Sequence, residues 1–131
     1  ICQAALDATL GWISQRKVDG KPLAERQGVQ WMIADMATEI EAARLLTWRA
    51  AALRQAGEPF AQAAAMAKLT ASETAGRVVD RALQLHGGYG YSRRLPLERL
   101  ARDARILRIY EGASEIQRNI IARHLLRESS R

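Results

Sequence analysis

The stretch from Gln84 to Arg118 reads QLHGGYGYSRRLPLERLARDARILRIYEGASEIQR and interrupts a helical pattern twice. The first interruption, Gly87–Tyr91, holds three glycines within four residues, which permits positive φ and close approach of a ligand to the backbone. The second, Tyr110–Gly112, places one glutamate beside a glycine between two helical runs. A carboxylate in that setting can project into a cleft and transfer a proton. We therefore expect the rest of the chain to be helix that holds these two interruptions.

Apolar residues recur at spacings of three and four through most of the chain, which predicts amphipathic helices. The predicted helices span residues 2–16, 25–56, 60–85 and 96–109, and a last helix begins at Ser114. Alternation of apolar and polar residues, the mark of a half-buried strand, is absent. We expect an all-α fold, an up-down four-helix-type bundle with an extra short C-terminal helix.

Local signals set the ends of these helices. Residues 16–23 are predicted to form a loop, because Gly20 and Pro22 end the first helical run. Ser114, with Gln117 three residues later, resembles a capping box. The segment 61–76 is rich in Ala, Ser, Thr and Gly, and small side chains let helices approach closely. We expect that segment to be buried between neighbouring helices.

The charge is positive but does not indicate a nucleic-acid partner. The chain has 131 residues, enough for one domain with a modest core, and a formal net charge of +6. All twelve basic residues from Arg77 onward are arginine, which makes bidentate contacts with phosphates and carboxylates. These arginines are interleaved with Asp and Glu, and no nucleic-acid motif accompanies them, so we expect no nucleic-acid partner.

Other residue types exclude several classes of site. Cys2 is the only cysteine, so an intrachain disulfide is impossible. His86 and His124 are the only histidines and lack ligand spacing, so we expect no metal site. No apolar run approaches the ~20 residues of a membrane span. The N-terminus shows neither an initiator methionine nor a signal-peptide pattern and begins within a helical pattern, so we expect a domain excised from a longer protein.

Two long segments resemble a known family. Residues 83–126, LQLHGGYGYSRRLPLERLARDARILRIYEGASEIQRNIIARHLL, look like the C-terminal signature of the acyl-CoA dehydrogenase family. Residues 15–44, QRKVDGKPLAERQGVQWMIADMATEIEAAR, are similar to the segment that precedes this signature in the family. The GGYGY and IYEG motifs occur together, in the family's order and at its separation. The resemblance covers nearly the whole chain.

The resemblance implies a fold and an activity. The family's C-terminal domain is a helical bundle of about this length, and it follows an N-terminal helical domain and a middle β domain that this chain does not contain. The family enzymes oxidise an acyl-CoA thioester to the trans-2-enoyl-CoA, with FAD as cofactor. The resemblance also implies a homodimer or homotetramer and an electron acceptor of the electron-transfer flavoprotein type. It implies a cytoplasmic location, or the mitochondrial matrix in a eukaryote.

Site residues are carried over from the matching motifs. Glu111 matches the base that removes the α-proton, and burial against the acyl chain and flavin would strengthen this base. The flanking Tyr110 and Gly112 match substrate-binding positions. The positions that match cofactor-binding residues are Arg16, Gln84, Gly87, Gly88, Ala113 and Glu115. Some branches of the family place the base on a different helix, which would lie upstream of Ile1.

Two positions depart from the family pattern. Asp19 replaces the usual aromatic residue, and an acidic group beside a pyrophosphate should turn away, pair with Lys17 or Lys21, or mark weakened FAD binding. Ala113 stands where a Ser or Thr hydroxyl is usual, which removes one hydrogen bond worth ~0.5–1.5 kcal/mol. These departures, with the missing domains, leave an alternative hypothesis open: a non-catalytic helical oligomerisation or adaptor module that retains the fold.

Overall fold

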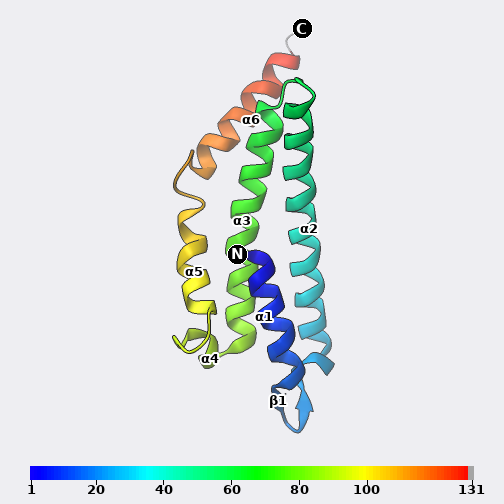
Figure 1. Ribbon diagram of the computed structural model, residues 1–131, viewed down its shortest axis with the longest axis vertical. Coiled ribbons are helices and arrows are strands. Elements are labelled where there is room, and N and C mark those ends of the chain that lie inside the picture. Colours follow the sequence, from blue (N-terminus) through cyan, green and yellow to red (C-terminus); the bar gives the residue numbers. More distant parts are fainter. Residues whose placement is uncertain (130–131) are drawn as a thin grey trace.

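The computed structural model describes residues 1–129 and is built from helices (Figure 1). The helices are α1 (Cys2–Gln15), α2 (Gln27–Gln55), α3 (Ala61–His86), α4 (Gly88–Tyr91), α5 (Leu97–Ile106) and α6 (Ser114–Ser129). Two short strands, β1 (Lys17–Val18) and β2 (Lys21–Pro22), and a 3-10 turn at Leu23–Glu25 connect α1 to α2. The predicted all-α class is confirmed.

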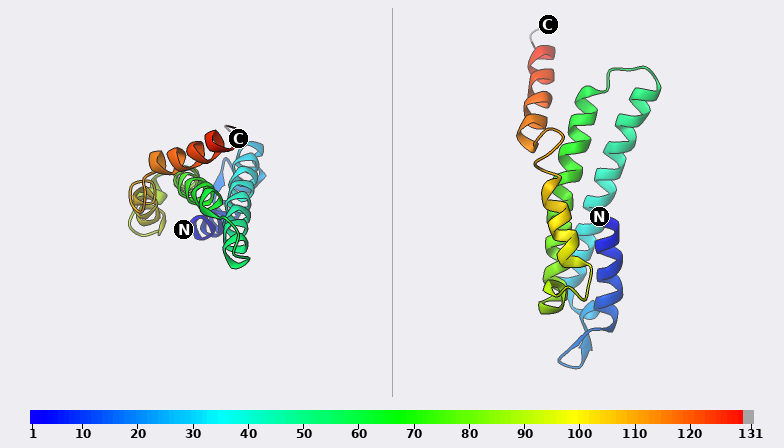
Figure 2. Two further views of the ribbon diagram at one scale, coloured as in Figure 1. Left: turned by 90° about the horizontal axis from the view of Figure 1, so that it is seen from above. Right: turned by 60° about the vertical axis from the view of Figure 1, so that its left-hand side comes forward.

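The long helices α2 and α3 form an antiparallel pair that runs the length of the bundle (Figures 1 and 2). Helices α1 and α5 flank the lower half of this pair in Figure 1, and α6 lies beside the upper half of α3. Helix α3 therefore contacts α1, α2, α4, α5 and α6 and is the centre of the fold. The four-helix-type bundle is as predicted, although the C-terminal helix, expected to be short, has 16 residues against 14 in α1.

Small side chains allow the close packing around α3. Ala63 and Ala67 of α3 pack with Ala50 of α2 in one apolar cluster, as the composition of residues 61–76 predicts. The main core lies in the lower half of the bundle, where larger side chains from four helices meet. Its buried members are Ala5, Leu6, Met36, Ile40, Ala75, Val78, Val79, Ala82, Leu97, Leu100 and Ala104.

The segment 16–23 is a β-hairpin rather than the predicted loop. Strands β1 and β2 pair antiparallel, with Val18 opposite Lys21. Asp19 and Gly20 form the two-residue turn with φ of +52° and +77°, the combination that matches the twist of paired strands. The hairpin fixes the chain that follows Arg16, since the Leu23 N–H also donates to the Arg16 carbonyl at 2.8 Å.

The glycine-rich interruption is a helical turn rather than an open loop. Gly87 ends α3 with φ of +58°, and α4 follows at once. A Cβ on Gly90 would lie 2.8 Å from the His86 Cβ and 2.9 Å from the Leu83 carbonyl oxygen, so only glycine lets α4 fold back on α3. Gly90 thus serves packing, whereas Gly87 and Gly88 face open space.

Candidate active site and cofactor site

Four of the predicted cofactor residues come together at the lower end of the bundle. Arg16, Gln84, Gly87 and Gly88 line one pocket of about 500 Å³, which we call the glycine pocket. Arg16 follows α1, Gln84 lies in the last turn of α3, and the glycines join α3 to α4. Helices α1 and α3 are in contact and run in the same direction, so their C-terminal ends bring these distant positions together (Figure 1).

Aromatic residues form much of the wall of the glycine pocket. The Trp12 ring stacks on His86 with centroids 5.0 Å apart, and it meets Tyr89 at 5.1 Å. The Arg16 guanidinium lies 5.4 Å from the centre of the Tyr89 ring, a cation–π contact that orients the arginine. The Trp12 Nε1 is buried and has no hydrogen-bond partner among residues 1–129.

The glycine pocket fits part of a dinucleotide. Added Cβ atoms on Gly87 and Gly88 would meet nothing within 4 Å, so a phosphate can reach the backbone there. Arg16 offers a planar cation suited to phosphate, and Trp12, which also lines the pocket, has a buried indole N–H without a hydrogen-bond partner within residues 1–129. FAD is a group that this donor set can hold through its phosphates.

Asp19 forms an ion pair with a residue other than the two predicted partners. Its carboxylate forms an ion pair with Arg26 at 3.4 Å, rather than with Lys17 or Lys21. The Arg26 Nη2 also donates to the Val18 carbonyl at 2.9 Å, so one guanidinium clasps the hairpin turn. The negative charge of Asp19 is therefore partly balanced before any anion reaches the glycine pocket.

The predicted base lies in a second pocket. Glu111 and Tyr110 line a cavity of about 430 Å³, which we call the Glu111 pocket. The other lining residues are mostly small or apolar: Ile1, Cys2, Lys68, Ala71, Ser72, Ala75 and Leu107. Glu111 itself is exposed, so the burial expected for a strong base is not supplied by residues 1–129. Burial raises the pKa of the Cys2 thiol on the same wall, which keeps that thiol protonated.

The backbone around Glu111 has an unusual conformation that neighbouring groups hold. Glu111 and Gly112 both have positive φ, +53° and +82°. The Lys68 ammonium donates to the Gly112 carbonyl at 2.8 Å, and the Gln117 amide donates to the same carbonyl at 3.0 Å. A Cβ on Gly112 would lie 2.5 Å from the Gln117 Nε2, so glycine is required for this contact.

The capping box predicted at the start of α6 is wrong. The Gln117 side chain bonds to the carbonyls of Gly112 and Glu111, instead of returning to the N–H of Ser114. The Ser114 N–H donates to the Arg108 carbonyl at 3.1 Å. The amide of a glutamine can donate or accept, and here its N–H group donates to the carbonyls of Gly112 and Glu111.

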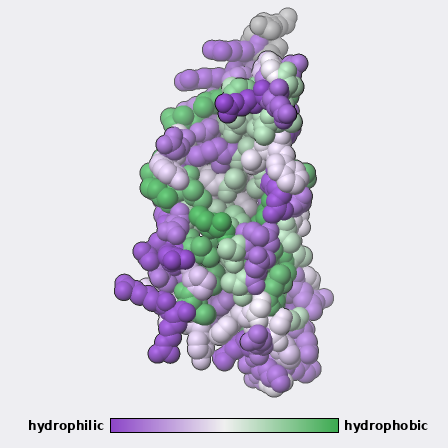
Figure 3. Space-filling view, in the orientation of Figure 1, coloured by the Kyte–Doolittle hydropathy of each residue, from purple (hydrophilic) through white to green (hydrophobic). Residues whose placement is uncertain are grey.

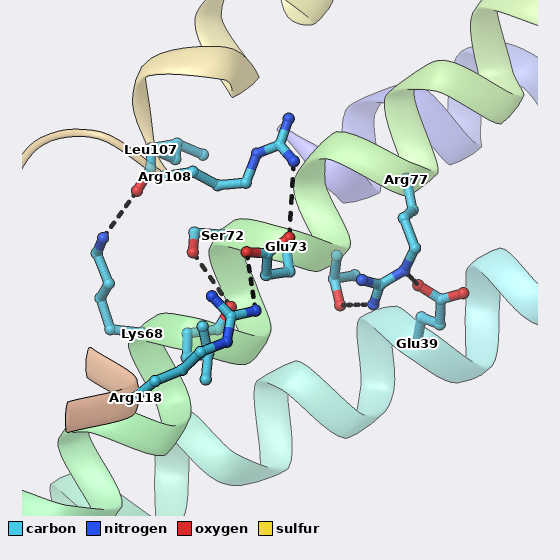
Figure 4. Close-up of polar contacts among 10 residues, drawn as sticks. Glu39, Lys68, Ser72, Glu73, Arg77, Leu107, Arg108 and Arg118 are labelled. Carbon is cyan, nitrogen blue, oxygen red and sulfur yellow. Dashed lines mark hydrogen bonds and ion pairs between the residues drawn. The ribbon is translucent and has the colours of Figure 1, made fainter. Parts of the chain in front are cut away.

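The remaining predicted cofactor residues lie apart from the glycine pocket. Ala113 and Glu115 line a third pocket of about 330 Å³ together with Arg105 and Arg108, which we call the Ala113 pocket. Glu73 lies on its wall and pairs with Arg108 at 3.6 Å and with Arg118 at 3.4 Å (Figure 4). Burial alone would raise the pKa of Glu73, but the Ser114 hydroxyl and the two guanidinium groups outweigh it and hold that pKa below its ordinary value.

The sites occupy different levels of α3. Lys68, at the Glu111 pocket, precedes Gln84, at the glycine pocket, by 16 residues of α3, or roughly 24 Å along a helix axis. In one chain, the predicted base Glu111 and the glycine pocket therefore lie far apart. On the face shown in Figure 3, hydrophobic residues gather over the middle of the bundle and hydrophilic ones over its ends.

Sequence reasoning missed Trp12 and Lys68. Trp12 lies four residues before Arg16 on the same helical face, and that spacing could have placed it in the pocket. Lys68 is the only charged residue between Ala61 and Ser72, an isolation within a small-residue helix face that could have marked it as a buried donor.

The chain is similar to known proteins over most of its length. The family model "Acyl-CoA dehydrogenase, C-terminal domain" matches residues 1–126. The short-chain specific mitochondrial acyl-CoA dehydrogenase of Bos taurus is 52% identical over 127 residues, which cover 97% of this chain and 31% of the bovine protein. The chain thus spans about a third of the length of the relatives it matches.

Solved structures share the fold. The butyryl-CoA dehydrogenase of Megasphaera elsdenii superposes with a TM-score of 0.94 at 45% identity, over 95% of this chain and 33% of that one. The FAD complex of PigA superposes with a TM-score of 0.92 at 33% identity, over 95% of this chain and 32% of that one. Within residues 1–129, no helix is long and apolar enough to cross a membrane.

Proposed function

Because the chain belongs to the acyl-CoA dehydrogenase family, as its C-terminal domain, we propose that it forms part of an FAD-dependent acyl-CoA dehydrogenase. The observation that carries this proposal is the pairing of Glu111, on the wall of an apolar pocket, with a separate phosphate-accessible glycine pocket. The activity is α,β-dehydrogenation of an acyl-CoA thioester. It requires an N-terminal helical domain and a middle β domain in addition to this one.

Glu111 performs the proton transfer. Its carboxylate takes the proton from the α-carbon of the acyl group, and the electrons of that C–H bond form the α,β double bond. Bound FAD would supply the acceptor for the hydride that leaves the β-carbon. Tyr110 and Gly112 flank the base at the substrate, and the N–H of Glu111 stabilises negative charge on the thioester oxygen. An exposed carboxylate is a weak base, so substrate and the further domains must enclose it.

The acyl group is short in this proposal. The names of two relatives, a short-chain specific acyl-CoA dehydrogenase and a butyryl-CoA dehydrogenase, support this substrate class.

Cofactor binding is assigned to the glycine pocket. Arg16 would hold a phosphate of FAD, the backbone at Gly87 and Gly88 would leave room for the pyrophosphate, and Gln84 would offer an amide. Ala113 and Glu115 contact cofactor at the Ala113 pocket. Because the two sets lie apart on one chain, we propose that two copies of the chain complete each site, with the glycine pocket of one copy serving the Glu111 of another.

A homodimer or homotetramer accounts for an exposed apolar face. Trp31, Leu45 and Trp48 of α2 are 63%, 53% and 61% exposed. Their spacing of 14 and 3 residues places them on one helical face, and large exposed apolar patches mark interfaces. We further propose an electron-transfer flavoprotein type acceptor and a cytoplasmic location, or the mitochondrial matrix in a eukaryote; the mitochondrial bovine relative supports the last point.

A complementation experiment tests this function. The complete polypeptide is prepared as Arg16→Met, as Glu111→Gln, and as a co-expressed mixture of both. Each single variant should fail to dehydrogenate a short acyl-CoA, Arg16→Met through lost flavin and Glu111→Gln with flavin retained. Mixed oligomers should regain activity, because some sites combine an intact Arg16 with an intact Glu111.

Three outcomes separate the hypotheses. Recovery of activity in the mixture supports the enzyme with a site shared between copies. If the wild type is active but the mixture regains no activity, the site is not shared between copies, and the proposed reaction still stands. An associated but colourless and inactive wild type refutes the enzyme and supports the non-catalytic oligomerisation module.

A further inference from the structure

We propose that Lys68 of α3 is a positioning residue for Glu111; this inference rests on the proposed function of Glu111 as the base. Lys68 belongs to a helix that contributes no predicted catalytic group. Its side chain nevertheless reaches across to the segment that carries Glu111, and both residues line the Glu111 pocket.

The contact spans the Glu111 segment. The Lys68 Nζ donates to the Leu107 carbonyl at 2.9 Å and to the Gly112 carbonyl at 2.8 Å (Figure 4 shows the first). Leu107 immediately follows Ile106, the last residue of α5, and Gly112 immediately follows Glu111. One ammonium group therefore fixes both ends of the stretch from Leu107 to Gly112, and Glu111 lies between the two fixed points.

The backbone of this stretch needs such a restraint. Glu111 has φ of +53°, a region that costs a residue with a Cβ about 1–2 kcal/mol. Glu111 is also exposed, so packing of its own side chain does not hold it. Direct hydrogen bonds to the neighbouring carbonyls are then the main restraint on where its carboxylate points.

Lys68 is committed to this contact. Its side chain is partly buried, and none of the ion pairs found within residues 1–129 includes it. The other cations on α3, Arg77 and Arg81, share the Glu39 carboxylate and tie α3 to α2. A partly buried ammonium that pairs only with backbone carbonyls is placed to set the path of that backbone.

Loss of Lys68 should shift the Glu111 segment without unfolding it. The Gln117 amide still donates to the Gly112 carbonyl at 3.0 Å after Lys68 is removed. The Ser114 N–H still donates to the Arg108 carbonyl. The segment keeps these two hydrogen bonds and loses both of those that Lys68 donates, at Leu107 and at Gly112. A small displacement of a reacting group is enough to slow the chemical step by as much as ~100-fold.

The test uses the complete FAD-loaded polypeptide and three variants. Lys68→Met removes both hydrogen bonds and keeps the apolar stem, and Lys68→Arg keeps donors on a longer side chain. Arg77→Met is the matched control, since it removes a cation from the same helix that contacts Glu39 and not the Glu111 segment. Turnover per bound flavin, KM, the isotope effect with α-deuterated acyl-CoA, and hydrogen exchange of the peptide containing residues 107–114 are measured.

Lys68→Met should lower kcat about 10- to 100-fold with KM changed less than about threefold, unchanged flavin content and a larger isotope effect. Exchange at residues 107–114 should quicken, Lys68→Arg should restore part of kcat, and Arg77→Met should match wild type. Unchanged kcat per flavin in Lys68→Met, or unchanged exchange there, overturns the proposal. A different outcome is that the wild type is inactive although it is loaded with flavin, while hydrogen exchange in Lys68→Met is fast. That outcome refutes the proposed function, and with it the role of Lys68.

Discussion

Replacement of Gly90 by alanine should destabilise the bundle, although alanine is the better helix former. The added Cβ would lie 2.8 Å from the His86 Cβ and 2.9 Å from the Leu83 carbonyl oxygen. Overpacking of this kind costs ~1–3 kcal/mol, and a backbone oxygen cannot rotate away. The gain in helix propensity returns up to ~1 kcal/mol. Because the overpacking cost exceeds the gain in helix propensity, we expect the free energy of unfolding to fall by ~1–2 kcal/mol.

The loss can be read as a change in melting temperature. An unfolding entropy of ~2.1 cal/mol/K per residue over 131 residues gives ~0.28 kcal/mol/K, so Gly90→Ala should lower Tm by about 4–7 °C. Far-ultraviolet circular dichroism on heating measures this.

Gly88→Ala is the matched control, because its Cβ would meet nothing within 4 Å. Its Tm should stay within about 2 °C of wild type, while flavin retention falls if phosphate approaches Gly88. Equal Tm values for Gly90→Ala and wild type would show that a Cβ at residue 90 does not clash with α3.

Two further predictions concern charge. Burial raises the pKa of Glu39, but hydrogen bonds and charge from Arg81 and Arg77 outweigh burial and hold that pKa below its ordinary value. The ionised Glu39 therefore stabilises the folded protein at pH values above ~4.3, the pKa in the unfolded chain. This stabilisation is lost as the pH falls through the lower pKa of the folded protein. Glu39→Gln should therefore cost ~1–2 kcal/mol near neutral pH, and its gap to wild type should narrow in acid, as urea titrations at several pH values can show; a gap independent of pH would contradict this. Asp19→Asn keeps a residue that tolerates positive φ and removes a negative charge next to the glycine pocket, so FAD should bind about twofold more tightly in a fluorescence titration, and weaker binding would contradict the electrostatic reading.

Much of the fold could be predicted because burial follows helical periodicity. The ends of α2 and α3 lie within two residues of the predicted 25–56 and 60–85. The hairpin was not predicted because strands of two residues are too short to show alternation of apolar and polar side chains. The Asp19–Gly20 pair is itself a hairpin signal. The capping box failed since a motif cannot tell which backbone group a glutamine amide will meet.

The candidate site was predicted only in part for a similar reason. Motif positions brought Arg16, Gln84 and the paired glycines into one pocket, because the ends of α1 and α3 meet there. The contact of Lys68 with the Gly112 carbonyl joins residues 44 apart in the chain, and no local pattern encodes it. The roles assigned to these residues toward FAD and substrate stay predictions.

The most direct test of the central claim is turnover of a short acyl-CoA by the complete, flavin-loaded polypeptide carrying Glu111→Gln. Glu58→Gln, an exposed glutamate in the turn between α2 and α3, is the control and should match wild type. We expect Glu111→Gln to keep its flavin and its assembly but to lose at least ~10³-fold in dehydrogenation rate per flavin. Turnover within a few-fold of wild type would contradict it, because another group would then remove the α-proton.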